Sequence, residues 1–241
     1  MHKLLIIIGI FLISSHSLSA KSIFNEFSTK ILNIEGETAI IQDSNDIVIG
    51  SSGIIVHTFE NNISTIIAHA NVIKKDGNRA TIEFGEYKYL TQIAFPKSGI
   101  TPAIGDKITL NYLYKRVLMV VPSYEIYEKV KKQFEGISWI HPDIVGAYLA
   151  KELKPNPNKK NFQKMCRINS AGLIFFALNN SSYFVDCNNF KVVKELKTDL
   201  IIKKAEVPFY TRVKEIKANW MNWNSTYIED YDTHYRKMIG K

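Results

Sequence analysis

Two hydrophobic patterns divide the chain near Pro122. From Thr29 to Val121, short apolar stretches with alternating polar residues are separated by glycine-containing turns, which is the pattern of antiparallel strands. After Pro122, apolar residues also recur at spacings of three and four, as in amphipathic helices. We therefore predict an α+β protein with two domains, an antiparallel β-barrel-like domain over residues 21–121 and an α+β domain over residues 122–241.

The first half is predicted to be a small antiparallel barrel or sandwich. The Asp76-Gly77 pair between two alternating stretches predicts a hairpin, because this dipeptide readily takes the positive φ angles of a tight turn. A tight turn at Pro102–Asp106 leads into a last strand that is expected to reach Val121. The other strands are expected within residues 31–41, around Glu35-Gly36, and over residues 47–49, 54–59, 63–73 and 80–84.

A β-hairpin of buried strands is the clearest element predicted in the second half. Two apolar stretches, Gly172–Leu178 and Tyr183–Val185, flank a polar turn at residues 179–182. A third strand is expected over residues 191–196, where lysines alternate with apolar residues. The turn before this third strand is expected at Asp186–Phe190.

The chain contains two cysteines, and one lies just outside each strand of this hairpin. In an exported protein the positions of Cys166 and Cys187 favour one intramolecular disulfide. That bond would close a loop of about 20 residues and stabilise the fold by roughly 3 kcal/mol. The alternative is a pair of buried free thiols.

The second half is also expected to contain four helices. Ser123 suits the N-cap of the first, and a segment opening at Trp139 leads into the second, with Pro142 in its first turn. In this second helix we expect Ile144, Tyr148 and Leu149 to face inward, and we expect a short third helix over residues 161–165. The last helix carries large apolar residues that either pack on the sheet or form an exposed face for a partner: Ile216, Trp220, Trp223, Tyr227, Tyr231 and Tyr235.

The N-terminus indicates export. Met1–Lys3 is a short basic region, Leu4–Ile13 is apolar, and small residues follow at Ser17–Ala20, so residues 1–20 read as a secretory signal peptide. The alternative is an uncleaved anchor, although the apolar stretch is shorter than the roughly 20 residues that span a bilayer. We expect the mature chain in the periplasm or at the cell surface, without a membrane span.

Charge separates the two halves further. The whole chain has a formal net charge of +8. Residues 21–109 carry 8 basic and 10 acidic side chains, whereas residues 110–241 carry 22 basic and 13 acidic side chains. The basic half favours an acidic envelope surface or an acidic protein as partner, and nucleic acid is not expected in that compartment.

Candidate catalytic residues are few, and we predict that the protein is not an enzyme. The sequence has no nucleophile-elbow, zinc-protease, P-loop or dinucleotide-binding motif, and His57 and His69 are not spaced as zinc ligands. A thiol site of His141, Asp143 and Cys166 can be imagined. Pairing with Cys187 accounts better for the cysteine, and helix capping accounts better for Asp143. Neither a metal nor a cofactor is expected.

Several short motifs in a fixed order resemble a known family. These motifs are Pro102-x-x-Gly105-Asp106, Arg116–Pro122, Trp139-x-His141-Pro142-Asp143, Cys166, Val185-Asp186-Cys187-x-x-Phe190 and Tyr231-Asp232-x-x-Tyr235. In this order and spacing the chain resembles the plasminogen-binding protein A N-terminal domain family of epsilonproteobacterial envelope proteins. The resemblance implies a binding protein rather than a catalyst.

The same resemblance implies host plasminogen as a partner. In that family, plasminogen binding is attributed to surface-displayed members with a C-terminal lysine, and longer members carry a charged tail after this domain. Here Lys241 is the candidate, and Gly240 is expected to leave it free to enter a pocket of a kringle domain. Lys159 and Lys160 are secondary basic candidates. The alternative function is an architectural periplasmic protein that binds envelope partners.

Overall fold

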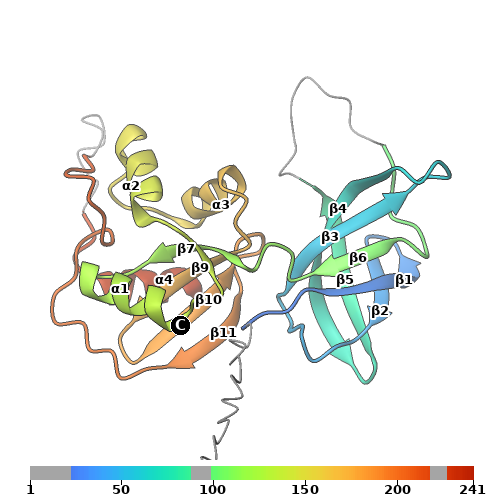
Figure 1. Cartoon of the computed structure of the whole chain (residues 1–241), viewed down its shortest axis with the longest axis horizontal. Helices are drawn as coiled ribbons and strands as arrows, with labels where there is room; N and C mark the ends of the chain where they lie inside the picture. Colours follow the sequence, from blue (N-terminus) through green and yellow to red (C-terminus); the bar gives the residue numbers. More distant parts are fainter. Residues whose placement is uncertain (1–22, 88–98, 218–226) are drawn as a thin grey trace, which may run out of the picture.

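The computed structural model describes residues 23–87, 99–217 and 227–241, and within them the chain forms two β-sheet units side by side (Figure 1). The first is a closed antiparallel barrel with strand order β1-β2-β5-β4-β3-β6. The second is a five-stranded mixed sheet with strand order β11-β10-β9-β7-β8, and helices cover it. The predicted α+β fold with a barrel and a helix-covered sheet is confirmed.

The barrel holds a continuous aliphatic core. Its strands are β1 (Phe27–Glu35), β2 (Thr38–Gln42), β3 (Ser52–Thr58), β4 (Ser64–Asp76), β5 (Arg79–Glu86) and β6 (Lys107–Leu110). Inward side chains such as Ile31, Val72 and Ile82 are fully buried, as the alternating pattern predicted. The hairpin at Asp76-Gly77 is confirmed, since β4 pairs with β5 and Gly77 has a positive φ of 59°.

One predicted barrel strand is wrong. Residues 47–49 form no strand, although the side chain of Ile47 is fully buried in the barrel core. Ile47 reaches the core from a turn, where its amide donates to the carbonyl of Ser44. An apolar triplet is too short to distinguish a strand from a turn that covers the end of a core.

The mixed sheet is buried on both faces. Its strands are β7 (Arg116–Val120), β8 (Ser138–Ile140), β9 (Leu173–Leu178), β10 (Ser181–Asp186) and β11 (Val192–Lys197). Strand β7 runs parallel to β8 and β9, and the pairs β9–β10 and β10–β11 are antiparallel, so the predicted hairpin and third strand are confirmed. Every residue of β9 and β10 is buried, which matches the unbroken apolar sequence of β9, whereas β10 also buries Ser181, Ser182 and Asp186 at its ends.

Helices pack on the two faces of this sheet. They are α1 (Tyr124–Gln133), α2 (Pro142–Lys151), α3 (Lys159–Ile168) and α4 (Tyr231–Ile239). On β7, Val117 and Met119 belong to the core cluster that includes α1. Leu118 and Val120 belong to the cluster that includes α2, α3 and α4. Side chains that alternate along one strand therefore serve two separate cores.

The change from barrel to mixed sheet occurs earlier than the pattern predicted. Residues 116–120 were expected to continue the last barrel strand, but they form β7 in the middle of the mixed sheet. The barrel ends at Leu110, and residues 111–115 connect the two sheets. Strand β7 has no period-two pattern: Val117–Val121 is an unbroken apolar stretch, which fits a strand that is buried on both faces. The division into two domains stays a prediction.

Two further details of the helices differ from the prediction. Trp139 lies in β8 rather than at the opening of a helix, and Ile144 is 45% exposed, whereas Val145 and Leu149 are buried. Residues 211–217 are not helical, and the last helix begins at Tyr231. Trp220 and Trp223 lie outside the described residues. In the described ranges no helix is long and apolar enough to cross a bilayer.

Candidate functional site

The C-terminal helix α4 is fixed to the mixed sheet by two buried tyrosines. The hydroxyl of Tyr231 lies 3.1 Å from the carbonyl oxygens of Val120 and Ala177. The hydroxyl of Tyr235 donates to the carbonyl of Pro208 at 2.7 Å. Burial raises the pKa of both phenols well above its ordinary value. These two rings pack inward as predicted, whereas Tyr227 is 57% exposed.

Both ends of α4 are also tied down. Asp230 is the N-cap, and its carboxylate accepts from the amide of Thr233 at 2.6 Å. Asp232 accepts from the amide of Asn179 and pairs with Arg236, each at 2.6 Å. At the other end, Gly240 takes a left-handed conformation with φ 74°, which ends the helix. Gly240 therefore terminates α4 rather than making the last residue free.

Lys241 is held against the edge of the mixed sheet. Its amide donates to the carbonyl of Arg236 at 2.9 Å. Its ammonium nitrogen lies 3.4 Å from Oε2 of Glu195 and 5.9 Å from the ring centroid of Tyr183. Lys197 contacts the other oxygen of Glu195 at 2.5 Å. We call Tyr183, Glu195, Lys197 and Lys241 the C-terminal cluster.

Two ammonium groups share one carboxylate in the C-terminal cluster. The hydrogen bond and charge of Lys197, with a smaller effect of Lys241, hold the pKa of Glu195 below its ordinary value. The side chain of Lys241 is 40% exposed, and exposed ion pairs exchange partners at little cost in free energy. The cluster carries one more positive than negative side chain and can release an ammonium group to an external carboxylate.

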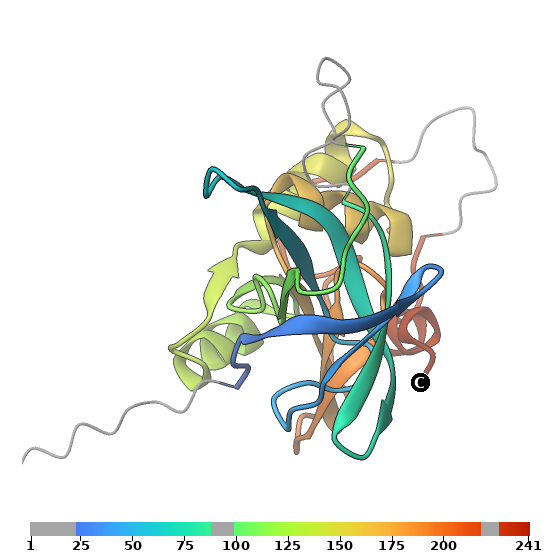
Figure 2. The same cartoon turned by 90° about the vertical axis from the view of Figure 1, so that its right-hand side faces the viewer.

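The structure does not bring the secondary candidates together with Lys241. Lys159 and Lys160 are exposed in the first turn of α3, and the ammonium of Lys159 lies 5.5 Å from the ring centroid of Phe190. In Figure 1 and Figure 2, α3 lies at the top of the molecule and the C-terminus lies well below it. The two basic regions are therefore separate surfaces.

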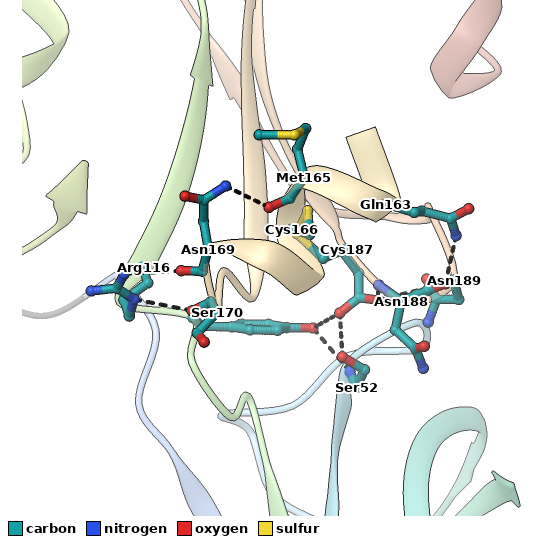
Figure 3. The surroundings of a disulfide bond; sticks show 12 residues. Ser52, Arg116, Gln163, Met165, Cys166, Asn169, Ser170, Cys187, Asn188 and Asn189 are labelled. Carbon is teal, nitrogen blue, oxygen red and sulfur yellow. Dashed lines mark hydrogen bonds between the residues drawn. A yellow bond between two sulfur atoms is a disulfide. The ribbon is translucent and has the colours of Figure 1, made fainter. Parts of the chain in front are cut away.

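The disulfide between Cys166 and Cys187 is confirmed. The two sulfurs are 2.02 Å apart, and both residues are buried where α3 crosses the end of β10 (Figure 3). Because Cys166 is bonded, it cannot act as a thiol nucleophile with His141 and Asp143. His141 instead caps α2, since its Nδ1 accepts from the amide of Asp143 at 3.1 Å.

The remaining titratable candidates also have structural partners. Asp143 accepts hydrogen bonds from Thr211 and Arg212, which lower the pKa of its carboxyl in spite of its partial burial. Nδ1 of His57 lies 2.8 Å from Asp106, and Nδ1 of His69 lies 2.6 Å from the carbonyl of Glu86. Among the residues that the structure describes, no group of three His, Cys, Asp or Glu side chains is placed to hold a metal ion.

A buried polar junction between barrel and mixed sheet was not anticipated from the sequence. Asp186, at the end of β10, is fully buried beside Cys187. Its Oδ2 accepts from Ser52 at 2.5 Å and from Tyr114 at 2.7 Å. Its Oδ1 accepts from the amides of Asn188 and Asn189 at 2.8 and 3.0 Å. Burial raises the pKa of Asp186 although these hydrogen bonds oppose the shift.

The two asparagines after the disulfide extend this junction into the barrel. Asn188 and Asn189 both donate to the side-chain oxygen of Asn71 on β4, at 2.9 and 3.1 Å. Asn189 also donates to the carbonyl of Gly50 at 2.8 Å. In Figure 3, Ser52 lies below the disulfide, and Asn188 and Asn189 lie to its right. The disulfide loop therefore positions the groups that join the mixed sheet to the barrel.

Comparison with known families identifies one match. The family described as plasminogen-binding protein pgbA N-terminal matches residues 26–239, which include every strand of both sheets and all of α4. No curated protein matches the chain. The matched range contains the whole disulfide loop and ends two residues before Lys241.

Proposed function

Because the chain belongs to the plasminogen-binding protein pgbA N-terminal family, we propose that it is an exported, non-catalytic binding protein that recognises host plasminogen through Lys241. The family is named for plasminogen binding, and the disulfide is typical of proteins in oxidising compartments. Only a surface-exposed chain can meet a host plasma protein, so the proposal includes display at the cell surface.

The observation that carries this proposal is the environment of the Lys241 ammonium. Lysine-binding pockets of kringle domains recognise an ammonium and a carboxylate through acidic, cationic and aromatic groups. Within its own chain, Lys241 already contacts an acidic group, Glu195, and an aromatic ring, Tyr183. A kringle pocket would replace these two contacts with groups of the same chemistry, so the exchange costs little.

The experiment measures binding of the chain, as printed, to immobilised plasminogen. Deleting Lys241, or extending the chain beyond it so that its α-carboxylate becomes an amide, should weaken binding sharply, and ε-aminocaproate should compete. Lys237→Ala is the matched control, because Lys237 is an exposed lysine of the same helix. Binding that survives both terminal changes but is lost in Lys159→Ala/Lys160→Ala would move the site to α3.

An architectural role is the second candidate, and the excess positive charge of residues 110–241 favours it. In this case the chain would bind acidic envelope partners and would not meet plasminogen. Protease accessibility on intact cells separates the two functions, because a periplasmic chain is protected until the outer envelope is opened. Protection on intact cells, together with no measurable binding of plasminogen, would leave the architectural role.

A further inference from the structure

The segment from the end of α2 through α3 concentrates positive charge. Over residues 151–168 the chain has six basic side chains and one acidic side chain, Glu152. We call this set the basic face: Lys151, Lys154, Lys159, Lys160, Lys164 and Arg167. The basic residues of α3 alternate with buried residues such as Phe162 and Met165, so the helix turns its cations away from the core.

Most of these cations are not neutralised within the protein. Lys164 lies 4.0 Å from Glu152 and 4.9 Å from the ring centroid of Tyr148. In the part of the chain that the structure describes, five cations of the basic face have neither an ion pair nor a side-chain hydrogen bond, and one of them, Lys159, lies over the ring of Phe190; the five are Lys151, Lys154, Lys159, Lys160 and Arg167. Like charges that lie close together repel, so binding of an external anion would reduce the electrostatic repulsion among these cations.

Aliphatic side chains are exposed among these cations. Leu153, two residues after α2, is 41% exposed, and Ile168, at the last position of α3, is 62% exposed. Exposure of such aliphatic side chains to water is unfavourable. Neither side chain belongs to the core cluster on the inner side of α3. Basic and exposed aliphatic side chains on one surface are the combination found on proteins that lie on a membrane.

We propose that the basic face binds the surface of a membrane that contains anionic phospholipid. The lysines and the arginine would contact headgroup phosphates, while Leu153 and Ile168 would enter the boundary between headgroups and acyl chains. A nucleic acid would satisfy the cations through its phosphates but offers little apolar surface to cover the aliphatic side chains. The membrane therefore accounts for both features of the surface.

This inference is independent of the proposed plasminogen site. The helix α3, which carries four residues of the basic face, lies above the C-terminus in both overall views (Figure 1 and Figure 2). A chain bound to lipid through α3 would keep the C-terminal cluster exposed. Loss of one activity in a variant need not affect the other, so the two proposals can fail separately.

The test is co-sedimentation of residues 21–241, without the apolar N-terminal segment, with vesicles of phosphatidylcholine alone or with phosphatidylglycerol added. We expect binding to the anionic vesicles only, and a decrease as salt is raised. Each basic side chain near an anionic surface contributes about fivefold to binding, so Lys160→Gln/Arg167→Gln should weaken it by about thirtyfold. Ile168→Ser should weaken binding without changing net charge.

The matched control is Lys203→Gln/Lys204→Gln, which removes the same charge from two exposed lysines after β11. Equal loss in this control would show that net charge, and not the basic face, drives binding, and would overturn the proposal. Equal binding to neutral and anionic vesicles would overturn the proposal as well. So would binding of inorganic polyphosphate that is as tight as binding of the vesicles and that Ile168→Ser does not weaken.

Discussion

Ser52 in β3 of the barrel donates a hydrogen bond to Asp186 at the end of β10, across 134 residues of sequence and at a distance of 2.5 Å. Tyr114, in the segment that connects the two sheets, donates to the same carboxylate oxygen. The amide of Ser52 in turn donates to the hydroxyl oxygen of Tyr114 at 2.9 Å. Barrel, connecting segment and mixed sheet therefore meet in one buried polar group.

Ser52→Ala should destabilise the protein by about 1.5–3 kcal/mol, the usual contribution of a hydrogen bond to a charged group. The free energy of unfolding, measured by urea denaturation, checks this value. Ser28→Ala is the control, because this hydroxyl bonds to Thr109 on the exposed surface of the same barrel and its loss should have little effect. Equal effects of the two substitutions would show that the hydrogen bond of Ser52 in the junction stabilises the protein no more than an exposed hydrogen bond does.

The same variant tests how tightly the two predicted domains are coupled. All three tryptophans lie in the second half of the chain, so their fluorescence follows that half, whereas far-ultraviolet circular dichroism follows both. We expect coincident transitions in the parent chain and separated transitions in Ser52→Ala, because the junction links two sheets that have separate cores. A single coincident transition in the variant would argue against two domains.

Asp186 should make stability depend on pH in a defined direction. Its pKa is raised in the folded protein, mainly by burial, so ionisation of this carboxyl disfavours folding. Its contribution to stability is greatest below its ordinary pKa of about 4 and decreases as the pH rises through the raised value. The difference in the free energy of unfolding between Asp186→Asn and the parent chain should therefore shift in favour of Asp186→Asn as the pH rises from 4 to neutrality. A pH-independent difference in the free energy of unfolding would contradict this assignment.

The disulfide should stabilise the fold by roughly 3 kcal/mol, from the closure of a loop with a sequence separation of 21 residues. Cys166→Ala/Cys187→Ala should show this loss in urea denaturation, and the denatured parent chain should contain no free thiol. Cys187 directly follows Asp186, so the loss should also weaken the junction with the barrel. The effects of Cys166→Ala/Cys187→Ala and Ser52→Ala should consequently be less than additive.

Local patterns predicted those elements whose neighbours are close in sequence. The β9–β10 hairpin follows from two apolar stretches around one short turn, and α2 follows from Pro142 at its first position. Strand β8 was missed because three residues between two helices carry no periodic signal, and only parallel pairing with β7 makes them a strand. The same limit explains why β7 was assigned to the barrel.

Parts of the candidate site could not be predicted because they depend on contacts between distant residues. The sequence identifies Lys241 as a candidate binding residue. Its contacts with Glu195 and Tyr183 arise only when α4 packs beside β10 and β11. Asp186 was part of the family motif, yet its burial depends on Ser52 and Tyr114 from other elements. The only sign of this junction in the sequence is an acidic residue, Asp186, directly after the apolar residues of a predicted strand.

The contact between Glu195 and Lys241 provides a final test of the plasminogen proposal. If a kringle pocket must displace Glu195 from the Lys241 ammonium, Glu195→Gln removes a competitor and should strengthen binding of plasminogen a few-fold. Glu215→Gln is the matched control, because Glu215 forms an exposed pair with Lys217 at the same distance of 3.4 Å. The two substitutions change net charge equally, so a difference between them reports the contact itself.

The decisive measurement repeats Glu195→Gln in a chain that lacks Lys241. The gain in affinity should disappear there, because Glu195 can compete only for an ammonium that is present. Surface plasmon resonance with immobilised plasminogen gives the four affinities of this double-mutant cycle. A gain that persists without Lys241 would mean that Glu195 acts through general repulsion of an acidic partner surface, with Lys197 as the alternative ammonium, and the proposed role of Lys241 would be wrong.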